Sequence, residues 1–379
     1  MTEQKNAPIP LSAPDITQAE IDAVTAVLRT PHLSLGPELA AFEQTFATYH
    51  HMPHAVAVSS GTAGLHLALV TLGIGEGHEV ILPSFTFIAV ANAVLQVRAT
   101  PVFAEIDPVT LNLSPAAVEQ AITPRTRAIL VVHTFGVPAE MDALQAIARR
   151  HHLALIEDAC EAIGAEFDGQ RAGSFGDLAV FGFYPNKQLT TGEGGAILAR
   201  DPVHAARLRS LRNQGRNPEA GWLDHAEIGY NYRLSDLACA LGRVQLSRIG
   251  EMLARRRAAA ERYHALLAEI PGLELPPLEL PRRTISWFVY VVRLPQEADR
   301  DRIQAALAAE GIATGRYFAP IHLQPAWRSQ TSAAAARLPL TESIARRTLA
   351  LPFFNRISSS QQEKVASALR DAAMFPQPS

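Results

Sequence analysis

The chain has 379 residues, of which 48% are hydrophobic and 19% are charged. At roughly 100–200 residues per domain, this length predicts two or three domains. Lys and Arg together number 34 and Asp and Glu 37, so the formal net charge is −3. Because this balance gives no strongly basic surface, it argues against nucleic acid or a membrane as the main partner. The composition favours an enzyme that acts on small metabolites.

Cysteine usage and hydropathy limit the compartment. Cys160 and Cys239 are too few for a disulfide framework, and no CxxC or Cys/His cluster offers a metal site. Met1–Pro14 has no apolar signal core, and no apolar stretch reaches the ~20 residues that a membrane span needs. We therefore expect a cytoplasmic protein with reduced thiols and no bound metal.

In the first half of the chain, short apolar runs alternate with stretches of helical periodicity. Thr17 and Glu20 form a capping box, in which two side chains bond free backbone N–H groups, and this predicts a helix through Leu28. Uninterrupted apolar strands separated by helices are typical of a parallel sheet covered on both faces. The expected strands are 55–58, 80–82, 101–104, 128–132 and 153–156, and the expected helices are 63–72, 88–97, 115–122 and 139–150.

The pattern changes after Leu234. Apolar residues of 234–253 keep approximately helical spacing, which predicts one long helix kinked at Gly250. The run Arg255–Arg257 is expected on a solvated helix face rather than in a nucleic-acid patch. A proline-rich connector then leads to a strand over 287–294 and helices over 300–310 and 360–373. The predicted parts are a flexible N-terminal segment (1–14), a large α/β domain (15–245) and a small C-terminal α+β domain (246–379).

Lys187 stands in an unusual setting for a lysine. It lies between an aromatic segment, Phe181–Tyr184, and a glycine-rich turn, Gly192–Gly195, whereas most lysines lie on solvated faces. Desolvation lowers the pKa of an amine, which makes the amine a nucleophile toward carbonyl groups. The glycines also let a flat ligand approach the backbone closely. From this segment alone, an ordinary hairpin with an exposed lysine is an equal alternative.

Two acidic residues end a predicted buried strand. Glu157 and Asp158 follow four apolar residues, Leu153–Ile156, at the carboxyl end of the strand, where parallel α/β sheets bind their ligands. A buried carboxylate needs a cationic partner, and a protonated pyridine nitrogen would be one. The alternative is an aspartate that caps the next helix.

The segment Ser59–Ala63 joins a predicted strand directly to a helix. Free backbone N–H groups, hydroxyls and the positive end of the helix dipole meet there, which suits a phosphate group. No GK(S/T) sequence follows, so a nucleoside-triphosphate loop is excluded. A phosphate site, an acid at a strand end and a lysine, in this order, match what pyridoxal 5'-phosphate requires.

In these features and in further sequence blocks, the chain resembles the DegT/StrS family of nucleotide-sugar aminotransferases, pyridoxal-phosphate enzymes of fold type I. The likeness extends from about Leu35 to Leu351 and implies a mostly parallel central sheet covered by helices. The blocks that carry it are Ser59-Ser-Gly-Thr-Ala63, Leu82-Pro-Ser-Phe-Thr-Phe87, Pro101-Val-Phe103, Ile156-Glu-Asp-Ala159, Lys187-Gln-Leu-Thr-Thr-Gly-Glu-Gly-Gly195, Leu211-Arg-Asn-Gln-Gly215, Gly229-Tyr-Asn-Tyr-Arg233, Tyr317 and His322-Leu-Gln-Pro325.

The resemblance implies roles for individual residues around the cofactor. Lys187 would form the Schiff base and carry the proton between substrate and cofactor. Asp158 would pair with the pyridine nitrogen, and Phe87 would stack on the ring, with plain core packing as the alternative for Phe87. Gly61 and Thr62 would hold the phosphate.

Further positions follow from the same resemblance. Glu161 would lie near the phenolic oxygen of the cofactor. Gly182 stands where many relatives have a serine that binds the phosphate, which leaves more of that contact to the backbone or to Asn231. Asn231 would come from a neighbouring subunit, which implies a homodimer with shared active sites. Tyr317 and His322 would lie on the sugar side.

The implied reaction is a transamination. Glutamate would give its amino group and leave as 2-oxoglutarate, and the keto sugar of a nucleotide sugar would accept the group. The short segment after Lys187 favours a 4-keto-6-deoxy sugar aminated at carbon 4 rather than carbon 3. One alternative is a pyridoxal-phosphate sugar dehydratase, in which relatives replace the lysine by histidine. Another is a non-catalytic regulatory protein on the same fold.

Overall fold

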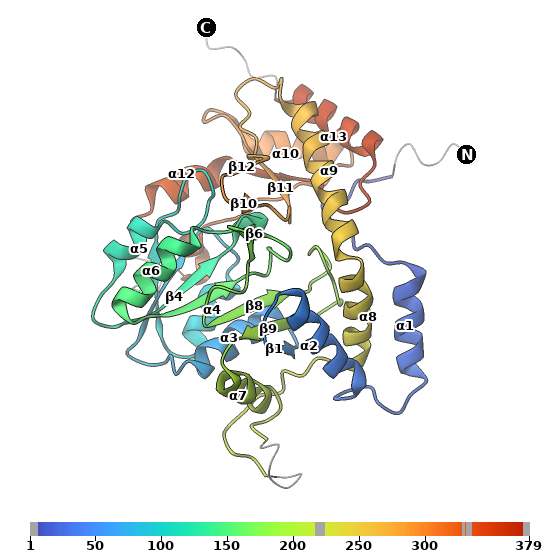
Figure 1. Cartoon of the computed structure of the whole chain (residues 1–379). Coiled ribbons are helices and arrows are strands. Elements are labelled where there is room, and N and C mark those ends of the chain that lie inside the picture. The colour runs from blue at the N-terminus through green and yellow to red at the C-terminus, as the bar shows by residue number, and fades with distance from the viewer. Residues whose placement is uncertain (1–6, 217–223, 328–329, 331–335, 374–379) are drawn as a thin grey trace.

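The computed structural model describes residues 7–216, 224–327, 330 and 336–373 (Figure 1). Its centre is a seven-stranded sheet in which only β9 runs antiparallel to its neighbours. The strands lie in the order β1 (His54–Val58), β9 (Gly195–Ala199), β8 (Leu178–Gly182), β5 (Ala154–Asp158), β4 (Thr126–Val132), β2 (Glu79–Pro83) and β3 (Thr100–Ala104). The predicted α/β fold with a mostly parallel sheet is confirmed.

Alternate residues of the strands explain the layers on the two faces of the sheet. In β1, Val56 and Val58 join one buried cluster, and Ala55 and Ala57 join another on the opposite face. Because side chains alternate across a strand, a strand covered on both faces is apolar throughout, as the sequence indicates. Helix α2 (Pro37–Tyr49) precedes β1, and the helices that follow strands of the sheet are α3 (Gly61–Thr71), α4 (Ala89–Gln96), α5 (Pro115–Ala121), α6 (Met141–His151) and α7 (Pro202–Arg212).

The predicted long helix is in fact two helices. The helix α8 (Asp236–Ser247) ends at Arg248, and α9 (Ile249–Leu267) follows at once, so the kink expected at Gly250 was placed wrongly. The Arg248 side chain donates to Glu20 Oε1 at 2.6 Å, in the N-terminal helix α1 (Gln18–Leu28), which lies beside α8. A tertiary contact of this kind is not visible in helical periodicity. The capping box at Thr17 is confirmed.

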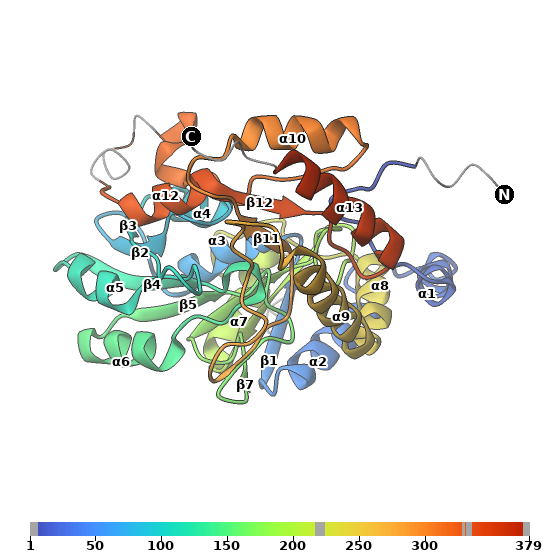
Figure 2. The same cartoon turned by 90° about the horizontal axis from the view of Figure 1, so that it is seen from above.

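Beyond α9 the chain forms a smaller layer, seen from above in Figure 2. The strand β11 (Tyr290–Arg293) pairs antiparallel with β12 (Thr348–Leu351), so the strand expected over 287–294 is shorter than predicted. The helices after α9 are α10 (Arg300–Ala309), α12 (Pro339–Arg347) and α13 (Ser359–Ala372). A separate three-stranded sheet joins β10 (Arg283–Thr284) to β6 (Glu166–Phe167) and β7 (Gln170–Arg171), which come before α9 in the chain. Since β10 pairs with β6, the chain after α9 also reaches back to the sheet-bearing part.

Residues 1–6 of the segment expected to be flexible lie outside the described residues. Its described part is bonded to the smaller layer: Ile9 N donates to Gly311 O at 2.8 Å, and Phe353 N donates to Leu11 O at 2.9 Å. Ile9 is buried. Residues 9–11 therefore belong to the packed fold.

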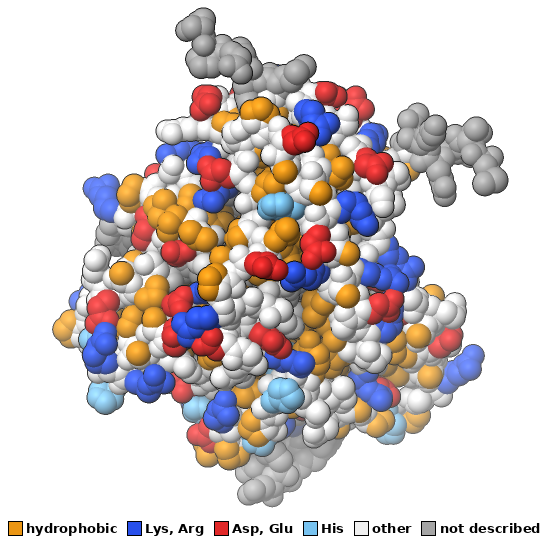
Figure 3. All heavy atoms as spheres, turned by 45° about the horizontal axis from the view of Figure 1, so that its top comes forward, with side chains coloured by type: hydrophobic (Ala, Val, Ile, Leu, Met, Phe, Trp, Pro, Cys, Tyr) orange, Lys and Arg blue, Asp and Glu red, His pale blue; other side chains and the backbone are white. Residues whose placement is uncertain are grey.

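Three further observations concern the charge of the surface, membrane-spanning helices and metal-binding groups. Figure 3 shows acidic and basic side chains interspersed on one face of the molecule. In the described part of the chain, no helix is long and apolar enough to cross a membrane. No group of three or more His, Cys, Asp or Glu side chains suited to a metal ion occurs among the described residues.

Candidate active site

A cavity of about 470 Å³ lies at the carboxyl ends of the parallel strands, a size typical of small-molecule sites. Segments that are distant in the sequence form its wall, because the loops after β1, β2, β5 and β8 meet at this edge of the sheet. The lining includes Ser60, Gly61, Thr62, Phe87, Asp158, Cys160, Glu161, Gly182, Tyr184, Asn186, Lys187, Glu193, Phe288 and Tyr317.

The start of α3 forms one end of the cavity. Ser60 caps the helix by accepting the Ala63 N–H at 3.0 Å, and Gly61 and Thr62 are the first helical residues. The free N–H groups of a first helical turn and the helix dipole favour an anion at this place. A Cβ on Gly61 would lie 2.9 Å from Cys160 Sγ, so only glycine fits there. The predicted phosphate cradle is thus a helix start that the structure brings to the cavity.

Neighbouring residues at the end of β5 have opposite surroundings. The Glu157 carboxylate is fully buried and accepts hydrogen bonds from His133 Nε2 and from the N–H groups of Gly173, Phe175 and Gly176, at 2.7–2.9 Å. Asp158 lines the cavity and accepts a hydrogen bond from Cys160 N at 3.0 Å. Among the residues that the structure describes, no cationic side chain forms an ion pair with Asp158. The carboxylate is placed for a cationic group in the cavity.

Lys187 enters the same cavity from the β8–β9 hairpin. Its side chain is only 16% exposed, so the alternative of an ordinary hairpin with an exposed lysine is wrong. Its Nζ lies 3.4 Å from Glu161 Oε1 and 4.0 Å from the centre of the Phe288 ring. Burial raises the pKa of Glu161, while Lys187 and the N–H of Phe135, which donates to Glu161 Oε2 at 2.9 Å, oppose this shift. The amine is held between a carboxyl group and an aromatic face.

Aromatic side chains form the rest of the wall. Phe87 is 60% exposed and lines the cavity, so the alternative that it is an ordinary core residue is wrong. Burial raises the pKa of Tyr317, which also lines the cavity. Sequence reasoning missed Phe288 and Tyr184. Phe288 is in the stretch predicted as an apolar strand, and the aromatic segment before Lys187 contains Tyr184, but neither pattern shows that the ring faces the lysine loop.

Two predicted site residues do not line this cavity. Asn231 is exposed and pairs through its backbone with Asn213. His322 is buried, with Nδ1 2.7 Å from Ser84 Oγ and Nε2 3.4 Å from Glu342 Oε1. From the sequence, the contacts that select the nucleotide and the sugar are expected in variable loops such as 217–227, of which residues 217–223 lie outside the described residues.

Cys160 and Gly182 fill the space behind the helix start. A Cβ on Gly182 would lie 3.2 Å from Cys160 Sγ. Burial, together with nearby Asp158, raises the pKa of the Cys160 thiol well above its usual value. A thiol that stays protonated is a poor nucleophile, so packing is the role that the structure supports for Cys160.

Comparison with known proteins agrees with this geometry. The sequence profile described as the DegT/DnrJ/EryC1/StrS aminotransferase family matches residues 14–370. The chain belongs to this family. The predicted family, the aminotransferase class and the cofactor, pyridoxal 5'-phosphate, are therefore confirmed.

Two family relatives and one solved structure are similar over nearly the whole chain. GDP-perosamine synthase of Caulobacter vibrioides is 40% identical, covering 95% of this chain and 97% of the relative. The dTDP-3-amino-3,4,6-trideoxy-alpha-D-glucose transaminase of Streptomyces venezuelae is 43% identical, covering 94% and 93%. The crystal structure of S. venezuelae DesV in complex with a ketimine intermediate has a TM-score of 0.90 and 40% identity, covering 98% of this chain and 100% of DesV.

The cavity fits the cofactor of the family. A flat, anionic, pyridine-bearing group needs a phosphate site, a carboxylate for its ring nitrogen and an amine for its aldehyde. The start of α3, the unpaired Asp158 carboxylate and the Lys187 amine all line one cavity. Phe87 adds a largely exposed ring on the same wall.

Proposed function

We propose that the protein transfers an amino group from glutamate to the keto group of a sugar carried on a nucleoside diphosphate. One observation carries the proposal: Lys187, Asp158 and the start of α3 line one cavity in a chain of this family. The sugar substrate is supported by the names of two relatives, a GDP-perosamine synthase and a dTDP-amino-sugar transaminase.

The roles of the residues follow from their positions. The N–H groups of Gly61 and Thr62 would hold the phosphate, and Asp158 would hold a proton on the ring nitrogen. When bound, pyridoxal phosphate supplies an electron sink for the carbon that loses or gains a proton. Lys187 Nζ would carry that proton, since of the two lysines that the structure describes it is the one that lines the cavity, and Lys364 is in α13. Glu161 lies 3.4 Å from this amine and would share a proton with it.

A homodimer with shared sites is part of the proposal. The exposed position of Asn231, outside the cavity of its own chain, supports a role in the cavity of a second copy. Mixing inactive Lys187→Ala with an impaired Asn231→Ala variant should restore activity, because one hybrid site keeps both native residues. No recovery after confirmed subunit exchange would contradict the shared site. For a biosynthetic enzyme of this kind we propose a cytoplasmic location.

The position of the new nitrogen is the finest part of the proposal. Glu193 and Gly194, at the end of the short segment after Lys187, line the cavity, which supports a role of this segment in setting how far the sugar enters. We propose carbon 4 of a 4-keto-6-deoxy sugar, although one relative makes a 3-amino sugar by its name. Matched 3-keto and 4-keto nucleotide sugars, with the product nitrogen located by NMR, test this choice. Amination of the 3-keto substrate alone would contradict it.

The decisive experiment separates the aminotransferase from its alternatives. The purified protein should be yellow, lose this colour on addition of glutamate, and aminate a keto sugar from a panel of nucleotide sugars with ¹⁵N-labelled glutamate, read by mass spectrometry. A dehydratase would release water from the sugar without incorporating the label. A regulatory protein would keep its colour when glutamate is added. Either result would overturn the proposal.

A further inference from the structure

A buried arginine lies directly behind the lysine loop. Arg256 of α9 is 1% exposed, although its neighbours Arg255 and Arg257 are exposed, so the expectation of a fully solvated arginine run is wrong at this position. Successive residues of a helix point in different directions, about 100° apart at 3.6 residues per turn. One arginine of three therefore faces inward while its neighbours face water.

The guanidinium of Arg256 is satisfied by neutral oxygens. Its Nε donates to Asn355 Oδ1 at 2.6 Å, its Nη1 to Trp287 O at 3.2 Å and Phe288 O at 2.9 Å, and its Nη2 to Lys187 O at 3.3 Å. In the described part of the chain, no carboxylate bonds it. Asp15 favours the charge electrostatically but does not bond it. A buried charge without a bonded counter-ion is costly, so its retention suggests a task. Burial lowers the pKa of Arg256 to about 9, and the group stays charged near neutral pH.

Two of the four acceptors belong to residues that meet in the cavity. Arg256 bonds the backbone carbonyls of Lys187 and Phe288, and the side chains of these two residues lie with Nζ 4.0 Å from the ring centre. The planar guanidinium of Arg256 therefore fixes the distance between the backbones of Lys187 and Phe288, which are about a hundred residues apart in the sequence. Asn355, in the loop after β12, orients this guanidinium by accepting a hydrogen bond from Arg256 Nε.

We propose that Arg256 is a positioning residue that holds the backbone of Lys187 against that of Phe288 and thereby aims the lysine amine into the cavity. This inference rests on the proposed role of Lys187 as the reacting amine. Lysine cannot replace Arg256, because a single ammonium at the end of a flexible stem does not span the Asn355, Phe288 and Lys187 oxygens together. A misplacement of about 1 Å at a reacting group can cost about 10²-fold in rate.

The sequence offers a spectroscopic test of position that needs no activity. Its lysines are Lys5, Lys187 and Lys364, so reductive methylation of the cofactor-free chain with ¹³C-formaldehyde gives few NMR signals. The Lys187 signal, assigned with Lys187→Arg, should be displaced by the ring current of Phe288 in the native chain. Arg256→Lys adds one lysine signal, which the double variant Arg256→Lys/Lys187→Arg identifies. In Arg256→Lys the Lys187 signal should move toward the position of the signal of Lys364, which does not line the cavity. Arg257→Gln, a change at the exposed neighbour on the same helix, should leave it in place.

Kinetics of the cofactor-loaded enzyme complete the test. Arg256→Lys should lower kcat by about 10–100-fold with KM for the sugar unchanged, as expected for a misplaced reacting group. Asn355→Ala keeps the arginine and its carbonyl contacts. It should displace the Lys187 NMR signal and lower kcat in the same direction as Arg256→Lys, but by less. This variant replaces Arg256→Lys in the test if Arg256→Lys does not fold. A Lys187 signal that stays displaced in both variants would overturn the inference. If the signal moves while native enzyme aminates no keto sugar, the positioning stands and the proposed function fails.

Discussion

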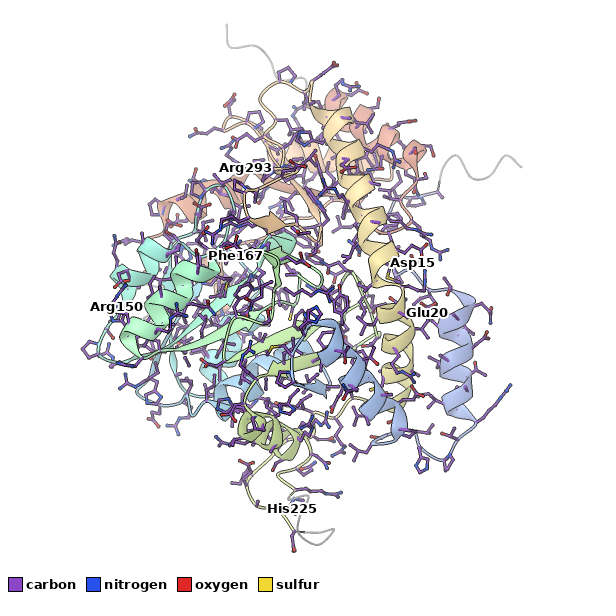
Figure 4. The ribbon with its side chains drawn as sticks, in the orientation of Figure 1. Asp15, Glu20, Arg150, Phe167, His225 and Arg293 are labelled. Atoms are coloured by element: carbon purple, nitrogen blue, oxygen red, sulfur yellow. The ribbon has the colours of Figure 1, made fainter. Side chains whose placement is uncertain are left out.

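Two groups of buried carboxylates, one where α1 meets α8 and one in the cavity, are stabilised in opposite ways. At the first, Figure 4 shows Asp15 and Glu20 beside the upper part of α8. Arg248 bonds both residues, and Gln245 Nε2 donates to Glu20 Oε1 at 2.8 Å. Burial alone would raise the pKa of Glu20, but hydrogen bonds from Thr17, Gln245 and Arg248 lower it to about 2. Both carboxylates are paired with arginine side chains of the protein; Asp15 Oδ2, which accepts no hydrogen bond, lies 3.6 Å from Arg255 Nη1.

The carboxyl groups of the cavity are less well compensated: in the described part of the chain no cation pairs with Asp158, and the partners of Glu161 do not offset its burial. Asp158 has one backbone donor, and burial raises the pKa of Glu161 against the opposing effect of Lys187. Phe87 is exposed on the same wall. The difference between the two regions indicates that the junction is complete as a structural contact, whereas the cavity has polar groups and a ring arranged for a ligand. Four predictions test this distinction.

The largest expected effect is at Lys187. Lys187→Ala should fold with unchanged stability and lose turnover, since proton transfer by a placed group alone contributes about 10²–10⁴-fold. The matched control is Lys364→Ala, whose Nζ bonds only Glu310 O on the surface. Steady-state amination and thermal unfolding of both variants check this. Native-like turnover by Lys187→Ala would show that the cavity lysine is not the reacting amine.

Next is Glu157, which lies beside Asp158 but resembles the complete junction. In Glu157→Gln an amide NH₂ replaces one oxygen and faces N–H donors, so we expect a loss of about 2–5 kcal/mol in the free energy of unfolding. His133 contributes to this cost, because its Nδ1 accepts the Ala139 N–H and its Nε2 must therefore donate. Urea unfolding measures the change. A variant as stable as the native chain would mean that the carboxylate is not required.

Asp158→Asn should show the reverse pattern, with stability kept and rate lost. A neutral amide cannot hold a proton on the cofactor nitrogen, and a charge-assisted hydrogen bond of about 1.5–3 kcal/mol felt in the transition state corresponds to roughly 10–150-fold in kcat. Asp158→Asn should therefore have a lower amination rate with an unchanged urea midpoint, whereas Glu157→Gln should have a lower urea midpoint. Because the strand β6 rather than a helix follows β5, an unchanged rate for Asp158→Asn would leave Asp158 only the hydrogen bond from Cys160 N in the turn after β5.

Much of the fold was predictable because strands covered on both faces consist of consecutive apolar residues, which are visible in the sequence. The five strands expected before residue 157 exist, with ends shifted by one or two residues. The break between α8 and α9 was not predictable, since it coincides with a contact from Arg248 to Glu20 more than 200 positions away. Gly250, the expected kink, lies in α9 where an added Cβ would meet nothing within 4 Å, so nothing there requires a glycine.

The site was predictable where a residue type is unusual for its sequence neighbourhood. A lysine among aromatic residues and an acid after an apolar strand indicate chemistry, and both line the cavity. Arg256 and Phe288 were missed for the converse reason: each suits its local pattern, a charged helix or an apolar strand. Their importance lies in contacts with Lys187, which only the fold creates.

The smallest effects concern pH, and the two regions should differ in sign. Glu20 has a pKa lowered from an ordinary 4.5 to about 2, so its contribution to stability is present above pH 4.5 and is lost as the pH falls toward 2. Glu161 has a raised pKa, so its contribution is present below 4.5 and is lost as the pH rises through its value in the folded chain. Glutamine cannot titrate, and each variant therefore removes one of these slopes.

Urea unfolding of the cofactor-free chain at about pH 3.5 and about pH 7 would measure both slopes. Glu20→Gln should destabilise by up to about 3 kcal/mol at the higher pH and by less at the lower one, because the pKa is lowered from 4.5 to about 2 and each pKa unit is worth about 1.4 kcal/mol. Glu161→Gln should be neutral or stabilising at the higher pH, since it removes a buried charge that burial disfavours, and this gain should vanish in acid. Equal slopes for the two variants would mean that the cavity carboxyl is as fully partnered as the one at the junction. The contrast between a complete contact and a site arranged for a ligand would then fail at Glu161, and only Asp158 would support it.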